Sequence, residues 1–257
     1  MARRFAFLDH PLSKAIAHRG GSLEVEENTL PAFAHAVGLG YSHVELDVHA
    51  TRDGVVVIHH DPTLERMTGD PRAIGDLAWS DLRGIRTHEG AEIPRLESLL
   101  EEHPGLFVNI EAKSDAVIDP LARVLQRMGA VGRVGVGSFK PRRTARLRAA
   151  LGAGLCWSPA HRQVLGLMLR GWRLPLPVGN FPVVQVPVRY KGVGVVSPRF
   201  VRAARRAGVA VQVWTVNDAI EMEQLLDMGV QGIMTDRPST LRKVLQARGE
   251  WRGDNDA

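Results

Sequence analysis

The sequence has little cysteine and few aromatic residues, and both shortages limit what the chain can be. Its single cysteine, Cys156, cannot form an internal disulfide, and the lack of a Cys-x-x-Cys pair or a Cys/His cluster argues against structural zinc. Aromatic residues make up only 5% of the 257 residues and do not alternate with basic ones, as a stacking platform for single-stranded nucleic acid would require. A reducing compartment fits this composition.

Long hydrophobic runs are also missing. No segment holds the roughly 18 uninterrupted apolar residues of a membrane span, and the N-terminus lacks the apolar core of a signal peptide. We therefore expect a cytoplasmic protein. With 44% hydrophobic and 24% charged residues, the chain has the balance of a globular protein with a large core. Disorder is expected only at the ends, including a flexible tail over about 249–257.

Positive charge exceeds negative charge, and most of it is arginine. The formal net charge of +5 favours anionic partners such as phosphate-bearing substrates. The basic cluster over 140–148 is explained by a solvated helix face, so we do not expect nucleic-acid binding. Segment 161–188 mixes arginine with tryptophan, leucine and proline. It is interpreted as an ordinary barrel helix with its loop, as an apolar wall beside the functional site, or as a patch in peripheral contact with a membrane.

Eight short β-rich runs recur along the chain, and most are followed by a helix-like stretch. This alternation predicts an α/β fold, a closed parallel (β/α)8 TIM barrel, as one domain over residues 1–257. The predicted strands cover 15–18, 43–48, 106–112, 134–139, 154–157, 183–188, 209–216 and 232–235.

One connection between predicted strands is much longer than the others. Residues 51–95, after the second strand, begin with Asp53-Gly54 between β-prone flanks, which is a strong hairpin signal, and continue into a turn-rich stretch. We expect this small insertion to fold over the C-terminal mouth of the barrel and to bring His60 there.

Candidate metal ligands fall at the C-terminal ends of predicted strands, where barrel enzymes place their active sites. Glu45 and Asp47 are two residues apart on one strand, so both side chains leave the same face and point inward. Because two close carboxylates repel each other, a hard divalent cation between them is the simplest resolution. Glu111, at the end of the third strand, completes a three-carboxylate site. Oxygen ligands alone do not distinguish Mg²⁺ from Ca²⁺.

Two of the ten histidines differ from the others in context. His18 precedes Arg19-Gly20-Gly21, where glycine lets the backbone approach a ligand, and His60 stands between the hairpin and Asp61-Pro62. Because imidazole titrates near neutrality, one histidine can accept a proton from an attacking hydroxyl while the other protonates a leaving oxygen. Seven histidines are interpreted as structural: His10, His35, His43, His49, His88, His103 and His161.

Other side chains near the strand ends suit a phosphodiester. Arg19 offers a planar fork for phosphate oxygens, and Lys113 offers a compact positive charge. Trp214, which ends the seventh predicted strand, can line a pocket for a small alcohol or pack in the core. The chain has no Gly-x-Ser-x-Gly elbow, and its glycine run over 132–137 lacks the Lys-Ser/Thr ending of a P-loop.

Together these residues resemble the glycerophosphodiester phosphodiesterase family. The resemblance implies a barrel with an insertion after the second strand, a divalent ion (Mg²⁺ or Ca²⁺) as cofactor, and a small-molecule glycerophosphodiester substrate. The shared motifs are His18-Arg19-Gly20, Glu27-Asn28-Thr29, Glu45-Leu46-Asp47, His60-Asp61-Pro62-Thr63-Leu64 with Arg66, Asn109-Ile110-Glu111-Ala112-Lys113, Ser138-Phe139, Val213-Trp214-Thr215-Val216-Asn217 and Gly232-Ile233-Met234-Thr235-Asp236 with Pro238.

The resemblance also implies a role for each site residue. His18 and His60 would be the catalytic acid/base pair. The metal ligands would be Glu45, Asp47 and Glu111, and the substrate-binding residues would be Arg19, Lys113, Trp214, Glu27 and Asn28.

The implied reaction converts a deacylated phospholipid headgroup into glycerol 3-phosphate and an alcohol. A free hydroxyl beside the phosphoester attacks phosphorus, and water opens the resulting cyclic phosphate. Residues 158–198 match the family only loosely, so lysophospholipase D-like cleavage of a lysophospholipid is the alternative. A non-catalytic binding barrel is a third interpretation, which is disfavoured because every expected catalytic position is filled.

Overall fold

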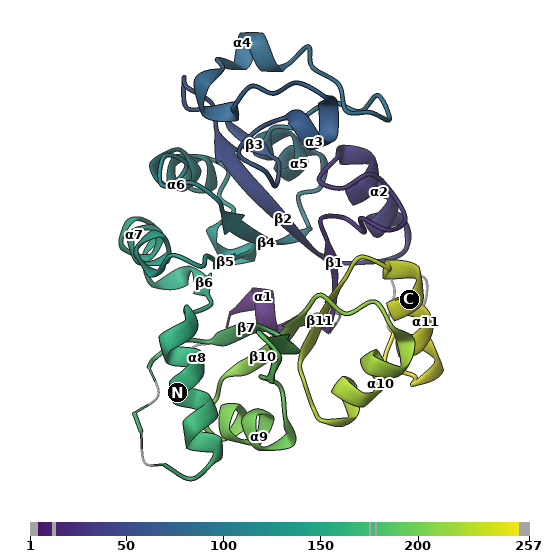
Figure 1. Ribbon diagram of the computed structural model, residues 1–257, viewed down its shortest axis with the longest axis vertical. Helices are drawn as coiled ribbons and strands as arrows, with labels where there is room; N and C mark the ends of the chain where they lie inside the picture. Colours follow the sequence, from purple (N-terminus) through teal and green to yellow (C-terminus); the bar gives the residue numbers. More distant parts are fainter. Residues whose placement is uncertain (1–4, 12–13, 175, 178, 252–257) are drawn as a thin grey trace.

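Eight parallel strands form a nearly closed barrel in the computed structural model, which describes residues 5–11, 14–174, 176–177 and 179–251 (Figure 1). The strand order is β6-β5-β4-β2-β1-β11-β10-β7, so the predicted TIM barrel is confirmed. The barrel strands are β1 (Ala15–His18), β2 (His43–Ala50), β4 (Phe107–Ala112), β5 (Val134–Gly137), β6 (Cys156–Trp157), β7 (Val183–Pro187), β10 (Ala210–Trp214) and β11 (Gly232–Thr235).

Helices between the strands cover the outside of the barrel, and several begin at caps that are visible in the sequence. Thr29 accepts a hydrogen bond from the Ala32 amide at the start of α2, and Pro31 occupies the first turn, where a missing N–H costs nothing. The larger helices are α2 (Leu30–Gly38), α5 (Leu96–Glu102), α6 (Ile118–Arg127), α7 (Pro141–Leu151), α8 (His161–Gly171), α9 (Pro198–Arg206), α10 (Ala219–Asp227) and α11 (Pro238–Ala247).

The barrel stays open between β6 and β7, which differs from the closed barrel that the sequence predicts. Strand β6 has only two residues, and Pro159, two positions after it, has no N–H to donate. The Gln185 amide on β7 donates instead to Ser158 Oγ, at 3.0 Å. Helix α8 lies in the connection across this opening.

The N-terminal end of the barrel is closed by the short helix α1 (Ala6–Asp9). Phe7 is fully buried and meets the rings of His43 and Phe107 edge to face, with centroids 5.2 and 6.4 Å away. Gly135 on β5 makes room for it, because a Cβ there would lie 2.9 Å from the Phe7 ring. Aromatic packing therefore seals the end of the barrel opposite the catalytic candidates.

The insertion after β2 folds as a small unit with its own core. The predicted hairpin is confirmed, because β3 (Val56–Ile58) pairs antiparallel with β2 and Gly54 turns the chain with a φ of 82°. Short helices α3 (Glu65–Thr68) and α4 (Trp79–Leu82) follow. The buried residues of this unit are Val57, Leu64, Ile74, Leu77, Leu82 and Ile93.

The C-terminal residues that the structure describes pack against the barrel. Trp251 is 9% exposed and lies against Tyr41, with ring centroids 5.2 Å apart, and Glu250 pairs with Lys14. Residues 252–257 of the predicted tail lie outside the described residues. None of the helices in the described residues combines the length and apolar character needed to span a bilayer.

Removal of the Phe7 ring should open the sealed end of the barrel. We expect Phe7→Ala to lower the free energy of unfolding by about 3–5 kcal/mol, because the cavity it leaves is bounded by β-strands that cannot collapse. Urea denaturation followed by circular dichroism measures this loss. Ile220→Ala, at a side chain that is 65% exposed, is the matched control and should change stability little. Equal effects of the two substitutions would contradict the assignment of Phe7 as a structural plug.

Candidate active site

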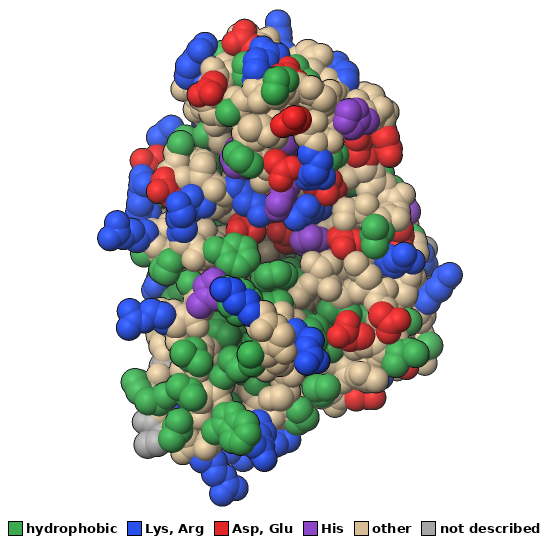
Figure 2. All heavy atoms as spheres, in the orientation of Figure 1, with side chains coloured by type: hydrophobic (Ala, Val, Ile, Leu, Met, Phe, Trp, Pro, Cys, Tyr) green, Lys and Arg blue, Asp and Glu red, His purple; other side chains and the backbone are tan. Residues whose placement is uncertain are grey.

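A cavity of about 550 Å³ opens at the C-terminal ends of the barrel strands. In Figure 2, acidic, basic and histidine side chains gather in the middle of this face, above a stretch of hydrophobic side chains. Eight of the predicted site residues line the cavity: His18, Arg19, Glu45, Asp47, His60, Glu111, Lys113 and Trp214. The other two, Glu27 and Asn28, are not among the lining residues and instead contact Arg19 and Asp47.

A tight turn after β1 presents both His18 and Arg19 to this cavity. Arg19 has a φ of 52°, and its backbone N–H donates to Glu45 Oε2 at 3.2 Å. Gly20 follows with a φ of 84°, and a Cβ there would lie 2.7 Å from the Cβ of Ala32. Only glycine therefore allows the chain to pass so close to α2.

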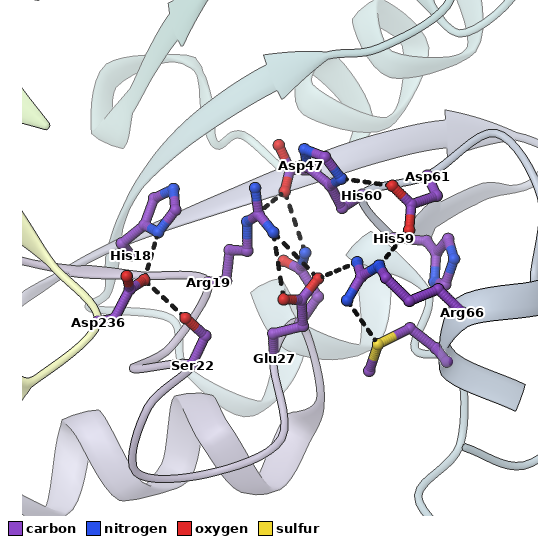
Figure 3. Close-up of polar contacts among 12 residues, drawn as sticks. His18, Arg19, Ser22, Glu27, Asp47, His59, His60, Asp61, Arg66 and Asp236 are labelled. Atoms are coloured by element: carbon purple, nitrogen blue, oxygen red, sulfur yellow. Dashed lines mark hydrogen bonds and ion pairs between the residues drawn. The ribbon is translucent and has the colours of Figure 1, made fainter. Parts of the chain in front are cut away.

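His18 is held by the carboxylate of Asp236, which directly follows the last strand of the barrel (Figure 3). Its Nδ1 lies 2.6 Å from Oδ1 of Asp236, which also accepts hydrogen bonds from Ser22 Oγ and Asn217 Nδ2. Burial alone would raise the pKa of Asp236, but these hydrogen bonds outweigh it and lower the pKa to about 2. An ionised carboxylate only accepts, so Nδ1 of His18 carries the proton and Nε2 is left for chemistry.

Nε2 of His18 lies 3.6 Å from Oε2 of Glu45. Burial disfavours the charged imidazole, but the carboxylates of Glu45 and Asp236 outweigh burial and raise the pKa of His18. The carboxylates on both sides of the ring therefore favour its protonated form.

His60 has the same arrangement on the opposite side, within the insertion. Its Nδ1 lies 2.7 Å from Asp61 Oδ1, and Arg66 Nε donates to the other oxygen of Asp61 at 2.5 Å. Arg66 Nη2 in turn donates to Glu27 at 2.6 Å, and Glu27 accepts from Arg19 Nη1 at 3.1 Å with both carboxylate oxygens. This chain of ion pairs joins the insertion to the turn after β1 (Figure 3).

The pKa values of Glu45 and Asp47 are shifted in opposite directions because the neighbours of the two carboxylates differ. Burial, then repulsion by Asp47, raises the pKa of Glu45 to about 7. Burial also opposes ionisation of Asp47, but Lys113 and Arg19 outweigh it and lower the pKa of Asp47. Lys113 Nζ lies 2.9 Å from Asp47 Oδ1 and 2.9 Å from Glu111 Oε2, so its ammonium group bridges the two carboxylates.

The donor set suits a hard divalent cation, although in the described residues no three His, Cys, Asp or Glu side chains are grouped closely enough to hold one as they stand. Carboxylate oxygens are the preferred ligands of Mg²⁺ and Ca²⁺, and added positive charge would let Glu45 ionise. In addition, Asn28 Oδ1 is buried without a hydrogen-bond partner, while its Nδ2 donates to Asp47. Polar atoms of this kind are usually satisfied by an ion or a water molecule.

The other wall of the cavity is mostly apolar. It comes from α8, from β7 and from the β8–β9 hairpin (Arg189–Tyr190 and Val193–Gly194). The ring of Phe139 meets Trp214 edge to face at 5.9 Å, and His161, interpreted above as structural, lines this wall with its ring 5.4 Å from Tyr190. Apolar residues of this wall include Val164, Leu165, Met168, Val186 and Val195.

The carboxylate partners of the two histidines are not among the site residues expected from the sequence. Asp236 and Asp61 lie in the shared motifs, but their contacts with His18 and His60 depend on which elements are neighbours. One signal was available, since Asp236 directly follows the last strand and Asp61 directly follows His60, both at the end of the barrel where catalytic groups gather.

The sequence model of the glycerophosphoryl diester phosphodiesterase family matches residues 18–240. A relative from Mycobacterium tuberculosis, "Probable glycerophosphodiester phosphodiesterase 2", is 42% identical, with 96% of each chain covered. "Lysophospholipase D GDPD1" from Homo sapiens is 28% identical over 91% of this chain and 86% of its own.

The fold is also similar to that of a solved structure. The crystal structure of a glycerophosphodiester phosphodiesterase from Agrobacterium tumefaciens matches with a TM-score of 0.75 and 24% identity, covering 91% of this chain and 99% of that one. Because the family match spans most of the barrel and the mycobacterial relative is similar over nearly its full length, the chain belongs to the glycerophosphoryl diester phosphodiesterase family.

Proposed function

We propose that the protein is a metal-dependent phosphodiesterase that hydrolyses glycerophosphodiesters to glycerol 3-phosphate and an alcohol. The observation that carries this proposal is the matched pair of imidazoles. His18 and His60 both face the cavity, and a carboxylate holds Nδ1 of each ring. Both rings therefore present Nε2 to the cavity, where one can accept a proton and the other can donate one.

In the proposed reaction the free hydroxyl beside the phosphoester attacks phosphorus. One histidine accepts the hydroxyl proton as the new P–O bond forms, and the other protonates the departing alcohol as the old P–O bond breaks. Water then attacks phosphorus and opens the cyclic phosphate. In this step the histidine that protonated the alcohol accepts a proton from water, and the other histidine protonates the ring oxygen as its P–O bond breaks. Arg19 and Lys113 hold the phosphoryl oxygens, and Trp214 lines the glycerol pocket. Glu27 fixes the position of Arg19, and Asn28 fixes that of Asp47.

Glu45, Asp47 and Glu111 would hold the divalent ion, either Mg²⁺ or Ca²⁺. When bound, it supplies positive charge that polarises the phosphoryl group. Lys113, which bridges Asp47 and Glu111, would then be released toward a phosphoryl oxygen.

A second candidate substrate, a lysophospholipid, is favoured by the apolar wall of the cavity. A deacylated headgroup offers little apolar surface to Val164, Leu165 and Met168, whereas an acyl chain would cover them. One human relative is named a lysophospholipase D, which is consistent with this alternative. Both substrates would be cleaved by the same polar groups.

Removal of either imidazole should stop the reaction with glycerophosphocholine. We expect His18→Ala and His60→Ala each to lower kcat by about 10²- to 10⁴-fold, since each removes a proton-transfer step. EDTA should abolish turnover, and added Mg²⁺ or Ca²⁺ should restore it. Choline release by the purified protein measures both effects, and His88→Ala, at an exposed ring outside the cavity, is the control. Full activity after EDTA treatment, or in either histidine variant, would refute the mechanism.

Asp236 should act as a positioning residue through His18. We expect Asp236→Asn to lower kcat about 100-fold with little change in KM, because a misplaced or wrongly protonated imidazole slows chemistry more than binding. Ser22→Ala removes another hydrogen bond to the same carboxylate and should cost much less. Steady-state kinetics and thermal unfolding of both variants separate a role in positioning His18 from a role in folding. Equal losses of kcat in the two variants would contradict a positioning role for Asp236. A loss of stability in Asp236→Asn that accounts for its loss of kcat would assign Asp236 to folding alone.

The apolar wall should decide between the two substrates. If it holds an acyl chain, Met168→Ser should lower kcat/KM for lysophosphatidylcholine about tenfold or more, the size of effect that lost apolar contact produces in a binding pocket. Glycerophosphocholine, which has no acyl chain, should be turned over as before. Ile220→Ser, outside the cavity, is the control. Equal kinetics of the Met168 variant and the control on lysophosphatidylcholine would exclude this wall as an acyl site.

A further inference from the structure

One long stretch of the chain has no negative charge. Between Asp119 and Asp218 there are seventeen lysines and arginines and not one Asp or Glu. This stretch includes helices α8 and α9, which pack against each other at the lower end of Figure 1. Ordinary protein surfaces intersperse charges of both signs, so this half of the molecule presents a positive potential to its surroundings.

The ends of α8 and α9 gather part of this charge in a shallow surface depression. We name it the arginine–tryptophan patch, and its residues are Arg170, Trp172, Arg173, Arg199, Arg202 and Arg206. All six are exposed, and in the described part of the chain none of the five arginines forms an ion pair. Their charges are therefore available to an anionic partner.

Exposed apolar side chains stand among these arginines. Trp172 is 68% exposed, with the guanidinium of Arg199 4.4 Å from its ring centroid, and Leu174 beside it is 46% exposed. Helix α8 itself buries only Leu167. Figure 2 shows hydrophobic side chains running from the cavity down the lower left of this face, with basic side chains beside them and acidic ones elsewhere.

We propose that the arginine–tryptophan patch docks the protein on an anionic lipid bilayer. Guanidinium groups around protruding tryptophan and leucine suit the boundary between lipid headgroups and acyl chains, where the cations meet phosphate and the apolar tips enter the bilayer. A nucleic-acid partner would use the arginines but would leave Leu165 and Leu174 exposed without a contact. The mixture of side chains therefore favours lipid.

Docking would also orient the cavity. Helix α8 lines the cavity with Val164, Leu165 and Met168, and ends at the patch with Arg170. Seating the patch on a bilayer therefore brings the apolar wall of the cavity toward the lipid surface. This consequence, unlike docking itself, rests on the proposed function, and it would let the site take a lysophospholipid directly from the membrane.

The test is cosedimentation of the intact protein with phosphatidylcholine vesicles, with and without phosphatidylglycerol as the anionic lipid. We expect binding only to the anionic vesicles and weaker binding at high salt. Arg202→Gln with Arg206→Gln should weaken binding about 25-fold, or about fivefold for each arginine, the factor that corresponds to about 1 kcal/mol per basic residue at an anionic surface. Trp172→Ser should also weaken it.

Arg83→Gln with Arg123→Gln, at two exposed arginines away from α8 and α9, is the matched control and should bind as the parent protein does. Turnover of glycerophosphocholine in solution should stay unchanged in every variant, which shows that all of them are folded. Failure of that turnover in the parent protein would refute the proposed function and leave the docking result valid.

Docking itself is overturned by any of three results: no binding to anionic vesicles, equal binding by the patch variants and the control, or tighter binding to duplex DNA than to the vesicles at the same salt concentration.

Discussion

Carboxylates enclosed at the mouth of an apolar barrel are the constraint on which the rest of this site depends. Glu45 and Asp47 are 5% and 1% exposed, and two charges so close and so buried require positive charge beside them. Lys113 and Arg19 supply it to Asp47, whereas burial and repulsion raise the pKa of Glu45 to about 7. Added positive charge beside Glu45 would therefore favour its ionised form.

The cations that neutralise these carboxylates must themselves be held, and this need links the site to the insertion. Arg19 is fixed by Glu27, and Glu27 by Arg66, which also fixes the carboxylate partner of His60. A side chain that balances charge at the barrel mouth thus also determines where one of the two imidazoles points. Residues that do not touch the cavity have an indirect effect on the chemistry proposed for it.

Acidic and basic side chains are distributed unevenly around the barrel. The acidic groups of the cavity come from β2 and β4, and Asp236 directly follows β11, whereas the stretch between Asp119 and Asp218 builds the apolar wall and a surface with only basic charge. The opening between β6 and β7 falls in this second half. One half of the molecule suits a phosphate and its metal ion, and the other suits an apolar group or a lipid surface.

The sequence by itself determined the strand–helix alternation, the hairpin after the second strand and the inward pairing of Glu45 with Asp47, because each follows from short-range periodicity or turn chemistry. It also placed both histidines at the barrel mouth. Only the tertiary structure decided which groups meet there. His18 and Asp236 are 218 positions apart, and they touch because β1 pairs with β11. The gap beside β7 likewise depends on two-residue β6, whose pairing no local pattern specifies. Contacts of this kind depend on strand order, which a linear motif does not encode.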